Sequence, residues 1–232
     1  MLHEVTEDGG LGFCHEALPD LLPWGYHGPL VVALDSNILI DLQQHGSALM
    51  NDEVPDVDAK YAADLNGLAD LLNLWLLRDI RFVVTPRALT DAKKNTERLT
   101  VGQWPAVEAV AASLAFQFGD WNAKPPSALG KLRALGGESG LPNGADRDLV
   151  LEAQAIHAHV FLTRDGRVIR QVRLTGPRLV VAAPRSLGLT LAGAGVEPFA
   201  GGVCGRNDCP YGDWQMPAPD IGKWGPLLGL FD

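Results

Sequence analysis

Four aspartates occupy positions that a parallel sheet and its connecting helices would bring close together. They are Asp35, Asp91, Asp148 and Asp165. Asp35 directly follows the apolar run Leu30–Leu34, which is typical of a strand buried on both faces of a parallel sheet. Asp165 follows a second such run, residues 160–163. Ligands of an open parallel sheet bind outside the carboxyl ends of its strands. We therefore expect Asp35 and Asp165 to lie at one edge.

The other two aspartates fall on predicted helices. Asp91 lies about two turns into the helix after the second strand, and Asp148 lies in the first turn of the helix before the Asp165 strand. Carboxylates gathered this closely raise one another's pKa unless a cation neutralises them. Mg²⁺ prefers oxygen ligands, and a divalent ion so held activates water for phosphodiester hydrolysis. The four acids therefore predict a catalytic Mg²⁺ or Mn²⁺ site.

Several residues around these acids leave alternatives open. Asp146 competes with Asp148 for the third position, and we prefer Asp148 because the aliphatic and alanine spacing after it fits better. Either residue could instead cap the helix, and Asp91 could be an ordinary surface charge. Asn37 either orients Asp35 or caps the following helix. Thr163 is expected to support the site by hydrogen bonding.

Four arginines recur at a spacing of three, beginning beside Asp165: Arg164, Arg167, Arg170 and Arg173. On a helix such residues are neighbours, so they would form a basic stripe able to hold a phosphate backbone. The alternative is a solvated helix face with salt bridges inside the protein. The sequence thus offers these arginines as nucleic-acid-binding candidates.

Three segments resemble the motifs of PIN-domain nucleases. Leu34-Asp35-Ser36-Asn37-Ile38-Leu39-Ile40-Asp41 resembles the opening signature of that family, Asp148-Leu149-Val150-Leu151-Glu152-Ala153-Gln154-Ala155 its third acidic motif, and Phe161-Leu162-Thr163-Arg164-Asp165 its fourth. The resemblance covers roughly residues 30–185. The chain departs from the pattern in two ways, because the second acid of the family is commonly Glu and because residues 43–59 lengthen the interval before Asp91.

The resemblance implies a PIN-like, Rossmann-like fold and an Mg²⁺- or Mn²⁺-dependent endoribonuclease that acts on RNA rather than DNA. It also implies the toxin of a toxin–antitoxin pair, with an antitoxin or other protein partner, or an RNA-processing enzyme; a homo-oligomer stays open. An aspartyl-phosphate phosphatase is disfavoured, because Asn37 occupies the position of the second Asp that such chemistry needs. The alternative to a nuclease is a non-catalytic nucleic-acid or protein-binding module that keeps the fold.

Hydrophobic periodicity predicts alternating strands and helices, hence a three-layer α/β sandwich with a central, mostly parallel sheet. We expect strands at 30–34, 81–84, 160–163 and 179–182, and helices at 37–42, 61–77, 86–98, 106–118, 146–158 and 165–172. Residues 1–29 read as an irregular N-terminal extension, 30–185 as the nuclease domain, and 186–232 as an extension containing Gly, Pro and Trp.

The net charge of −9 is unevenly distributed. Residues 31–185 hold 18 acids and 17 Lys or Arg, so a nucleic-acid substrate is not excluded. No apolar run approaches the roughly 20 residues that span a bilayer. The first residues lack a signal-peptide pattern, and the odd number of cysteines, three, disfavours a secreted disulfide framework. We therefore expect a soluble, cytoplasmic protein.

Cys204 and Cys209 have a spacing compatible with half of a zinc site. The remaining ligands would have to come from Cys14 and His15, far away in the sequence. Because no second closely spaced pair is present, we favour cysteines without a metal.

Overall fold

The computed structural model describes residues 2–6, 10–51, 53, 55–94, 140–174 and 178–212. The predicted helix 106–118 and the aromatic residues Trp214, Trp224 and Phe231 lie outside these ranges. The chain divides into two compact units, of which unit 1 comprises Met1–Val31, Ala48–Arg81 and Pro184–Asp232, and unit 2 comprises Val32–Ser47 and Phe82–Ala183. Both predicted extensions therefore belong to unit 1, together with a segment from the middle of the chain.

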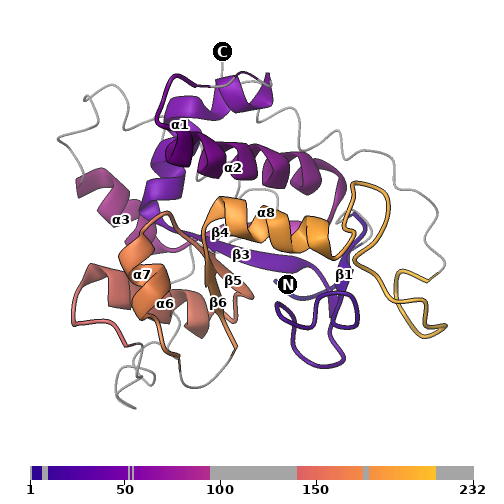
Figure 1. The fold of residues 1–232 in the computed structure, drawn as a ribbon. Coiled ribbons are helices and arrows are strands. Elements are labelled where there is room, and N and C mark those ends of the chain that lie inside the picture. The colour runs from indigo at the N-terminus through magenta and orange to yellow at the C-terminus, as the bar shows by residue number, and fades with distance from the viewer. Residues whose placement is uncertain are drawn as a thin grey trace. The chain divides into compact units, whose positions relative to one another are not determined.

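Four strands form one parallel sheet in the order β4-β3-β5-β6 (Figure 1). Their bounds are β3 Leu30–Leu34, β4 Ile80–Val84, β5 Val160–Leu162 and β6 Val180–Ala182. Leu34 is in register with Leu162, so the carboxyl ends of β3 and β5 lie side by side. The predicted α/β class and parallel sheet are confirmed. Every residue of β3, β4 and β5 is buried, which explains their continuous apolar sequence.

Unit 2 contains α3 Pro86–Lys94, α6 Ala145–Ala155 and α7 Gly166–Gln171. Helix α3 packs on α6, α6 contacts β5, and α7 contacts β6. The side chain of Thr85 accepts a hydrogen bond from the amide of Ala88 at 3.2 Å, so it caps α3.

Helix α1, Ser36–Met50, follows β3 and is longer than predicted. We expected it to end near Leu42, but it continues for two more turns. Leu42 and Leu49 are both 3% exposed, and they keep the helical spacing of seven that extends the buried face. The first part of the segment that lengthens the interval before Asp91, residues 43–50, is therefore helix.

Unit 1 contains the antiparallel strands β1 Phe13–Cys14 and β2 His27–Gly28, and the helices α2 Ala59–Leu77 and α8 Pro184–Gly193. Helix α2 begins at its cap Asp58, close to the predicted start. Among the described helices, none combines the length and apolar character that a membrane crossing requires.

Helix α8 was missed by the sequence analysis, which predicted an irregular tail from Ser186. Its glycines, including Gly188, weaken helix propensity, but packing on α2 stabilises the helix (Figure 1). Leu187 and Leu191 are buried. The backbone of Arg185 lies so close to Gly67 of α2 that a Cβ there would stand 2.5 Å from the Arg185 nitrogen. Small residues thus allow the two helices to approach closely.

Candidate active site

Asp35 lies just past the end of β3, where its carboxylate is buried and surrounded by hydrogen-bond donors. Its Oδ1 accepts from the amide of Ser36 at 2.6 Å, and its Oδ2 accepts from Asn37 Nδ2 at 2.7 Å and Thr163 Oγ1 at 2.6 Å. Burial raises the pKa of Asp35, although the hydrogen bonds from Thr163 and Ser36 lower it, and the negative charge of Asp146 raises it further. The site thus holds an acid that is costly to ionise.

Asn37 and Thr163 connect Asp35 to the segment after β5. Thr163 Oγ1 accepts from Asn37 Nδ2 at 3.1 Å and from the amide of Asp165 at 3.0 Å. Asn37 Oδ1 accepts from the amide of Arg164 at 3.1 Å. The geometry favours the first interpretation of Asn37, that it orients Asp35. Thr163 makes the supporting hydrogen bonds that the sequence predicted.

Asp165 caps α7. Its Oδ1 accepts hydrogen bonds from the amides of Arg167 at 2.7 Å and Val168 at 3.3 Å. Its Oδ2 lies 3.8 Å from Arg167 Nη2, and the side chain is 36% exposed. Its Oδ1 therefore has a local structural role as the helix cap, whereas its Oδ2 lies near the guanidinium of Arg167.

Asp146 and Asp148 both lie in the first turn of α6. The cap position of that helix is Gly144, and no side chain makes a capping hydrogen bond, so neither aspartate has the capping role considered above. Asp146 is paired with Arg167, the arginine that also approaches Asp165. The pairing with Arg167 thus connects Asp146 to Asp165.

Arg87 lies between Asp91 and Asp148. Its Nε is 2.9 Å from Asp91 Oδ2, and its Nη1 is 3.8 Å from Asp148 Oδ2. The hydrogen bond to Asp91 is the main reason that the pKa of Arg87 is raised, and the charges of Asp148 and Glu152 add to it. Through Arg87, Asp91 is therefore linked to Asp148 of α6.

Glu152 is an acid of this group that the sequence analysis did not select. It follows Asp148 by four residues, so it lies on the same side of α6. It is only 5% exposed, and its Oε2 has no hydrogen-bond partner among the described residues. The spacing of four from Asp148 was the signal that could have revealed it.

The four arginines do not form one helical stripe, because α7 spans only Gly166–Gln171. Arg164 precedes the helix and is paired with Asp41, which is 1% exposed; its Nη2 donates to Asp41 Oδ1 at 2.7 Å. Arg173 follows the helix and donates to the carbonyl of Arg170 at 3.0 Å. Arg164 is therefore a structural ion-pair partner, whereas Arg167, Arg170 and Arg173 are exposed.

The chain matches no family model, no curated protein and no solved structure.

A second group of potential metal ligands lies in unit 1. In the described ranges, Cys14, His27, Cys204 and Cys209 are the one set of three or more such residues whose ligand atoms all lie within 4.8 Å of one another. His15, which the sequence suggested as a ligand, is not part of it, because its Nδ1 is hydrogen-bonded to the carbonyl of Leu22 at 2.9 Å. The sequence analysis favoured cysteines without a metal and did not predict that His27 lies beside all three of them.

Proposed function

We propose that this chain is an Mg²⁺- or Mn²⁺-dependent nuclease that hydrolyses phosphodiester bonds of RNA. The observation that carries the proposal is the buried carboxylate of Asp35 at the carboxyl end of β3, next to Thr163 and in the field of Asp146. A carboxylate is costly to bury, and a bound cation offsets that cost.

The donor set fits a hard divalent cation. Carboxylate oxygens, such as those of Asp35, Asp146 and Asp165, are the ligands that Mg²⁺ and Mn²⁺ prefer. Among the described residues, no three of the acids Asp35, Asp91, Asp146, Asp148, Glu152 and Asp165 lie close enough together to form a ready metal group, so a cation would have to draw them closer. The buried Oε2 of Glu152 lacks a hydrogen-bond partner in the described part of the chain, and a cation or its bound water would satisfy it. The same six acids are the residues that would hold the metal.

The residues of the chain would divide the work of hydrolysis. Asn37 and Thr163 hold the Asp35 carboxylate in one orientation. Arg87 and Arg167 neutralise the surrounding acids in the absence of a cation. A divalent ion in such a site supplies an activated water and stabilises the charge that develops on the phosphate. The exposed Arg167, Arg170 and Arg173 would bind the phosphate backbone.

The choice of RNA, and a role as a toxin or in RNA processing, follow from the motif resemblance of Asp35-Ser36-Asn37 and Thr163-Arg164-Asp165 to PIN-domain nucleases. An antitoxin or another protein partner belongs to the same proposal.

A non-catalytic module is the second candidate, and one observation favours it. Arg87 and Arg167 each bridge two of the acids, so four of the six acids already lie near cations of the protein itself. In such a module the acids would serve as a salt-bridge network, as in many stable folds.

Metal-dependent cleavage separates the two candidates. The protein is dialysed into magnesium-free buffer and mixed with labelled single-stranded RNA, structured RNA and single-stranded DNA, with Mg²⁺, Mn²⁺ or Ca²⁺ added. A nuclease cuts RNA with Mg²⁺ or Mn²⁺ and binds without cutting when Ca²⁺ is present. Binding that ignores the metal, without cleavage of any substrate, would leave the binding module as the correct candidate.

A further inference from the structure

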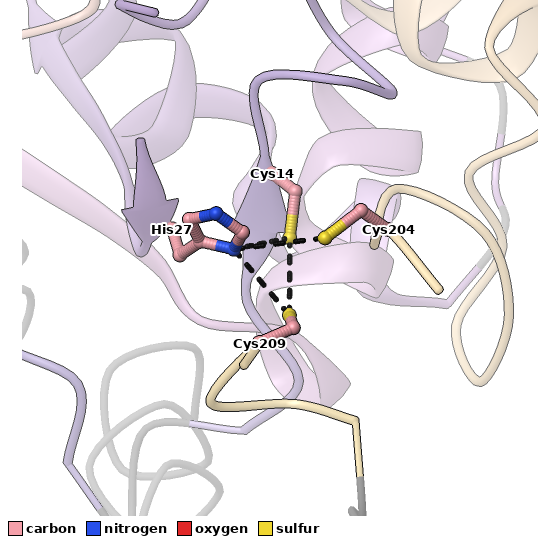
Figure 2. A group of neighbouring side chains, drawn as sticks. All are labelled: Cys14, His27, Cys204 and Cys209. Atoms are coloured by element: carbon pink, nitrogen blue, oxygen red, sulfur yellow. Dashed lines mark hydrogen bonds between the residues drawn. The ribbon is translucent and has the colours of Figure 1, made fainter. Parts of the chain in front are cut away.

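Three cysteines and one histidine converge in unit 1, apart from every residue of the proposed nuclease site. Figure 2 shows the side chains of Cys14, His27, Cys204 and Cys209 pointing toward one another. Cys14 Sγ lies 3.3 Å from His27 Nδ1 and 3.5 Å from Cys209 Sγ. His27 Nδ1 lies 3.4 Å from Cys209 Sγ and 3.7 Å from Cys204 Sγ. Four soft or borderline donor atoms thus surround one point.

These separations match the edges of a tetrahedral zinc site. With Zn–S near 2.3 Å and Zn–N near 2.0–2.1 Å, tetrahedral angles give about 3.8 Å between two sulfurs and about 3.6 Å between sulfur and nitrogen. The sulfur–sulfur distance between Cys14 and Cys209 is 3.5 Å, and the three sulfur–nitrogen distances run from 3.3 to 3.7 Å. All three cysteines are free thiols.

The fold places each ligand by local backbone pairing. Cys14 and His27 are partners in the antiparallel pair β1–β2, so their side chains lie on the same face. The amide of Cys14 donates to the carbonyl of Gly202 at 2.8 Å, which brings the segment before Cys204 to β1. The amide of Cys209 donates to the carbonyl of Arg206 at 3.1 Å and closes the turn between the two late cysteines.

The surroundings suit a structural site, because two of its ligands, Cys14 and Cys209, are buried, while His27 and Cys204 are partly buried. Leu11, Cys14, Cys209 and Tyr211 form a buried cluster, with Val203 packed against it. Burial raises the thiol pKa of Cys14 and of Cys209, whereas hydrogen bonds from the backbone amides of Cys204 and Tyr211, respectively, lower it. Amide donors of this kind stabilise metal-bound thiolates.

We propose that Cys14, His27, Cys204 and Cys209 bind one Zn²⁺ ion in a tetrahedral, structural site. Four protein ligands leave no open position for substrate, which distinguishes a structural from a catalytic zinc. Binding takes three thiolates and a neutral imidazole, so three thiol protons are released to solvent and the centre has a net charge of −1. Thiolates select zinc over Mg²⁺ or Mn²⁺.

Zinc binding would join distant parts of the sequence. Cys14 and Cys209 are 195 residues apart, and no other covalent or metal cross-link is present between described residues. Arg78 already connects the same segments, because its guanidinium donates to the carbonyls of Leu11, Gly12, Glu197, Ala200 and Gly201. A ligand that binds only the folded form stabilises it, so zinc would stabilise the region that this arginine organises.

Metal analysis of the purified full chain tests the proposal. We expect one equivalent of zinc in the wild type, and a cobalt(II)-substituted form with the visible absorption of a tetrahedral thiolate complex. His27→Ala should reduce zinc to a small fraction of one equivalent. The matched control is His15→Ala, which removes the neighbouring histidine and should keep one equivalent. Cys204→Ser, at the half-exposed cysteine, provides a second ligand variant if His27→Ala does not fold.

Three results would overturn the inference. The first is a folded wild type that retains no zinc after zinc is supplied. The second is a His27→Ala or Cys204→Ser variant that binds zinc as tightly as the wild type. The third is a thiol titration of the denatured protein, purified without reductant, that finds one free thiol in place of three, because a disulfide would then link two of the cysteines. Three free thiols with one zinc support the site.

Discussion

Asp35 shows how much the surroundings of one carboxyl group determine its chemistry. The residue is 6% exposed, and donors from Ser36, Asn37 and Thr163 occupy both of its oxygens. These hydrogen bonds favour the charged form, but burial has the larger effect, and the pKa is raised. In the metal-free protein, ionisation of Asp35 therefore opposes folding.

The pH dependence of stability follows from this shift. A raised pKa means that the folded state binds more protons than the unfolded state between pH about 3.9 and the higher folded value. The stabilising contribution is present at low pH and is lost as pH rises through the folded pKa. With magnesium absent, the melting temperature of Asp35→Asn minus that of the wild type should increase with pH across this window. A difference that stays constant or decreases would contradict the assigned shift.

The arginines around α7 separate into two roles at the scale of the element. Arg164 neutralises the buried Asp41, so Arg164→Ala should destabilise the fold by about 3 kcal/mol. Arg167, Arg170 and Arg173 are exposed, and their joint replacement by Ala should weaken RNA binding. Losing three phosphate contacts lowers the slope of log affinity against log salt by about two. Binding of a labelled single strand at several salt concentrations, with Ca²⁺ present, measures this slope.

The single variant Arg164→Ala is the control for the triple variant of Arg167, Arg170 and Arg173. Arg164→Ala should leave the salt slope unchanged while lowering the melting temperature. If the triple variant kept the wild-type slope, these arginines would serve only the protein's own ion pairs, such as the one between Arg167 and Asp146.

The packing of α8 on α2 gives a second prediction at this scale. A Cβ at Gly67 would meet backbone atoms of Pro184 and Arg185 at 2.5–2.7 Å, and backbone yields less readily than a flexible side chain. Gly67→Ala should therefore destabilise the protein by about 1–3 kcal/mol. Gly193→Ala is the matched control, because nothing lies within 4 Å of its Cβ position and Ala favours helix. Equal melting temperatures for both variants would refute the close helix contact.

Elements with strong local patterns were predictable from the sequence, and those created by long-range packing were not. The continuous apolar runs of β3 and β5, and the leucine spacing of α2, gave those elements nearly at their observed bounds. Helix α8 was missed because its glycines disfavour helix locally, whereas packing on α2 stabilises it. Likewise, the pairing of Cys14 with His27 depends on the register of β1 and β2, which no local pattern specifies.

In the candidate active site, too, residues next to strands were predictable from the sequence, and contacts between distant elements were not. Asp35 was found because it directly follows β3, and Asp165 because it lies shortly past the end of β5, with Thr163 between that strand and Asp165. Glu152 was overlooked because a glutamate four residues after an aspartate on a helix is ordinary in sequence. Its burial, and the lack of a hydrogen-bond partner for its Oε2 among the described residues, distinguish it in the structure. The pairing of Arg87 with two acids joins α3 to α6, which lie far apart in the sequence.

At the scale of the whole molecule, the two proposed metal sites use different chemistry in different units. Oxygen ligands in unit 2 select Mg²⁺ or Mn²⁺, and sulfur ligands in unit 1 select zinc. The stabilisation by Mg²⁺ and the binding of zinc should therefore be separable by mutation. Asp165→Asn keeps a good helix cap but removes a negative charge, so Mg²⁺ should raise its melting temperature less than that of the wild type.

The zinc content of the same variant is the internal check. Asp165→Asn should retain the zinc equivalent of the wild type, because its change lies in unit 2. Equal magnesium-induced shifts in the two proteins would show that Asp165 is only a helix cap.

The central claim is that the carboxylate of Asp35 is required for metal-dependent RNA cleavage. The most direct measurement compares the initial rate of single-stranded RNA cleavage at saturating Mg²⁺ or Mn²⁺ for the wild type, Asp35→Asn and Asp70→Asn. Asp70 is an exposed aspartate of α2 in unit 1, so its variant controls for the loss of one charge. We expect the wild type and Asp70→Asn to cleave at equal rates, and Asp35→Asn to lose at least about a hundredfold, in line with the loss of a preorganised catalytic group. A folded Asp35→Asn variant that cleaves as fast as the wild type would contradict the claim.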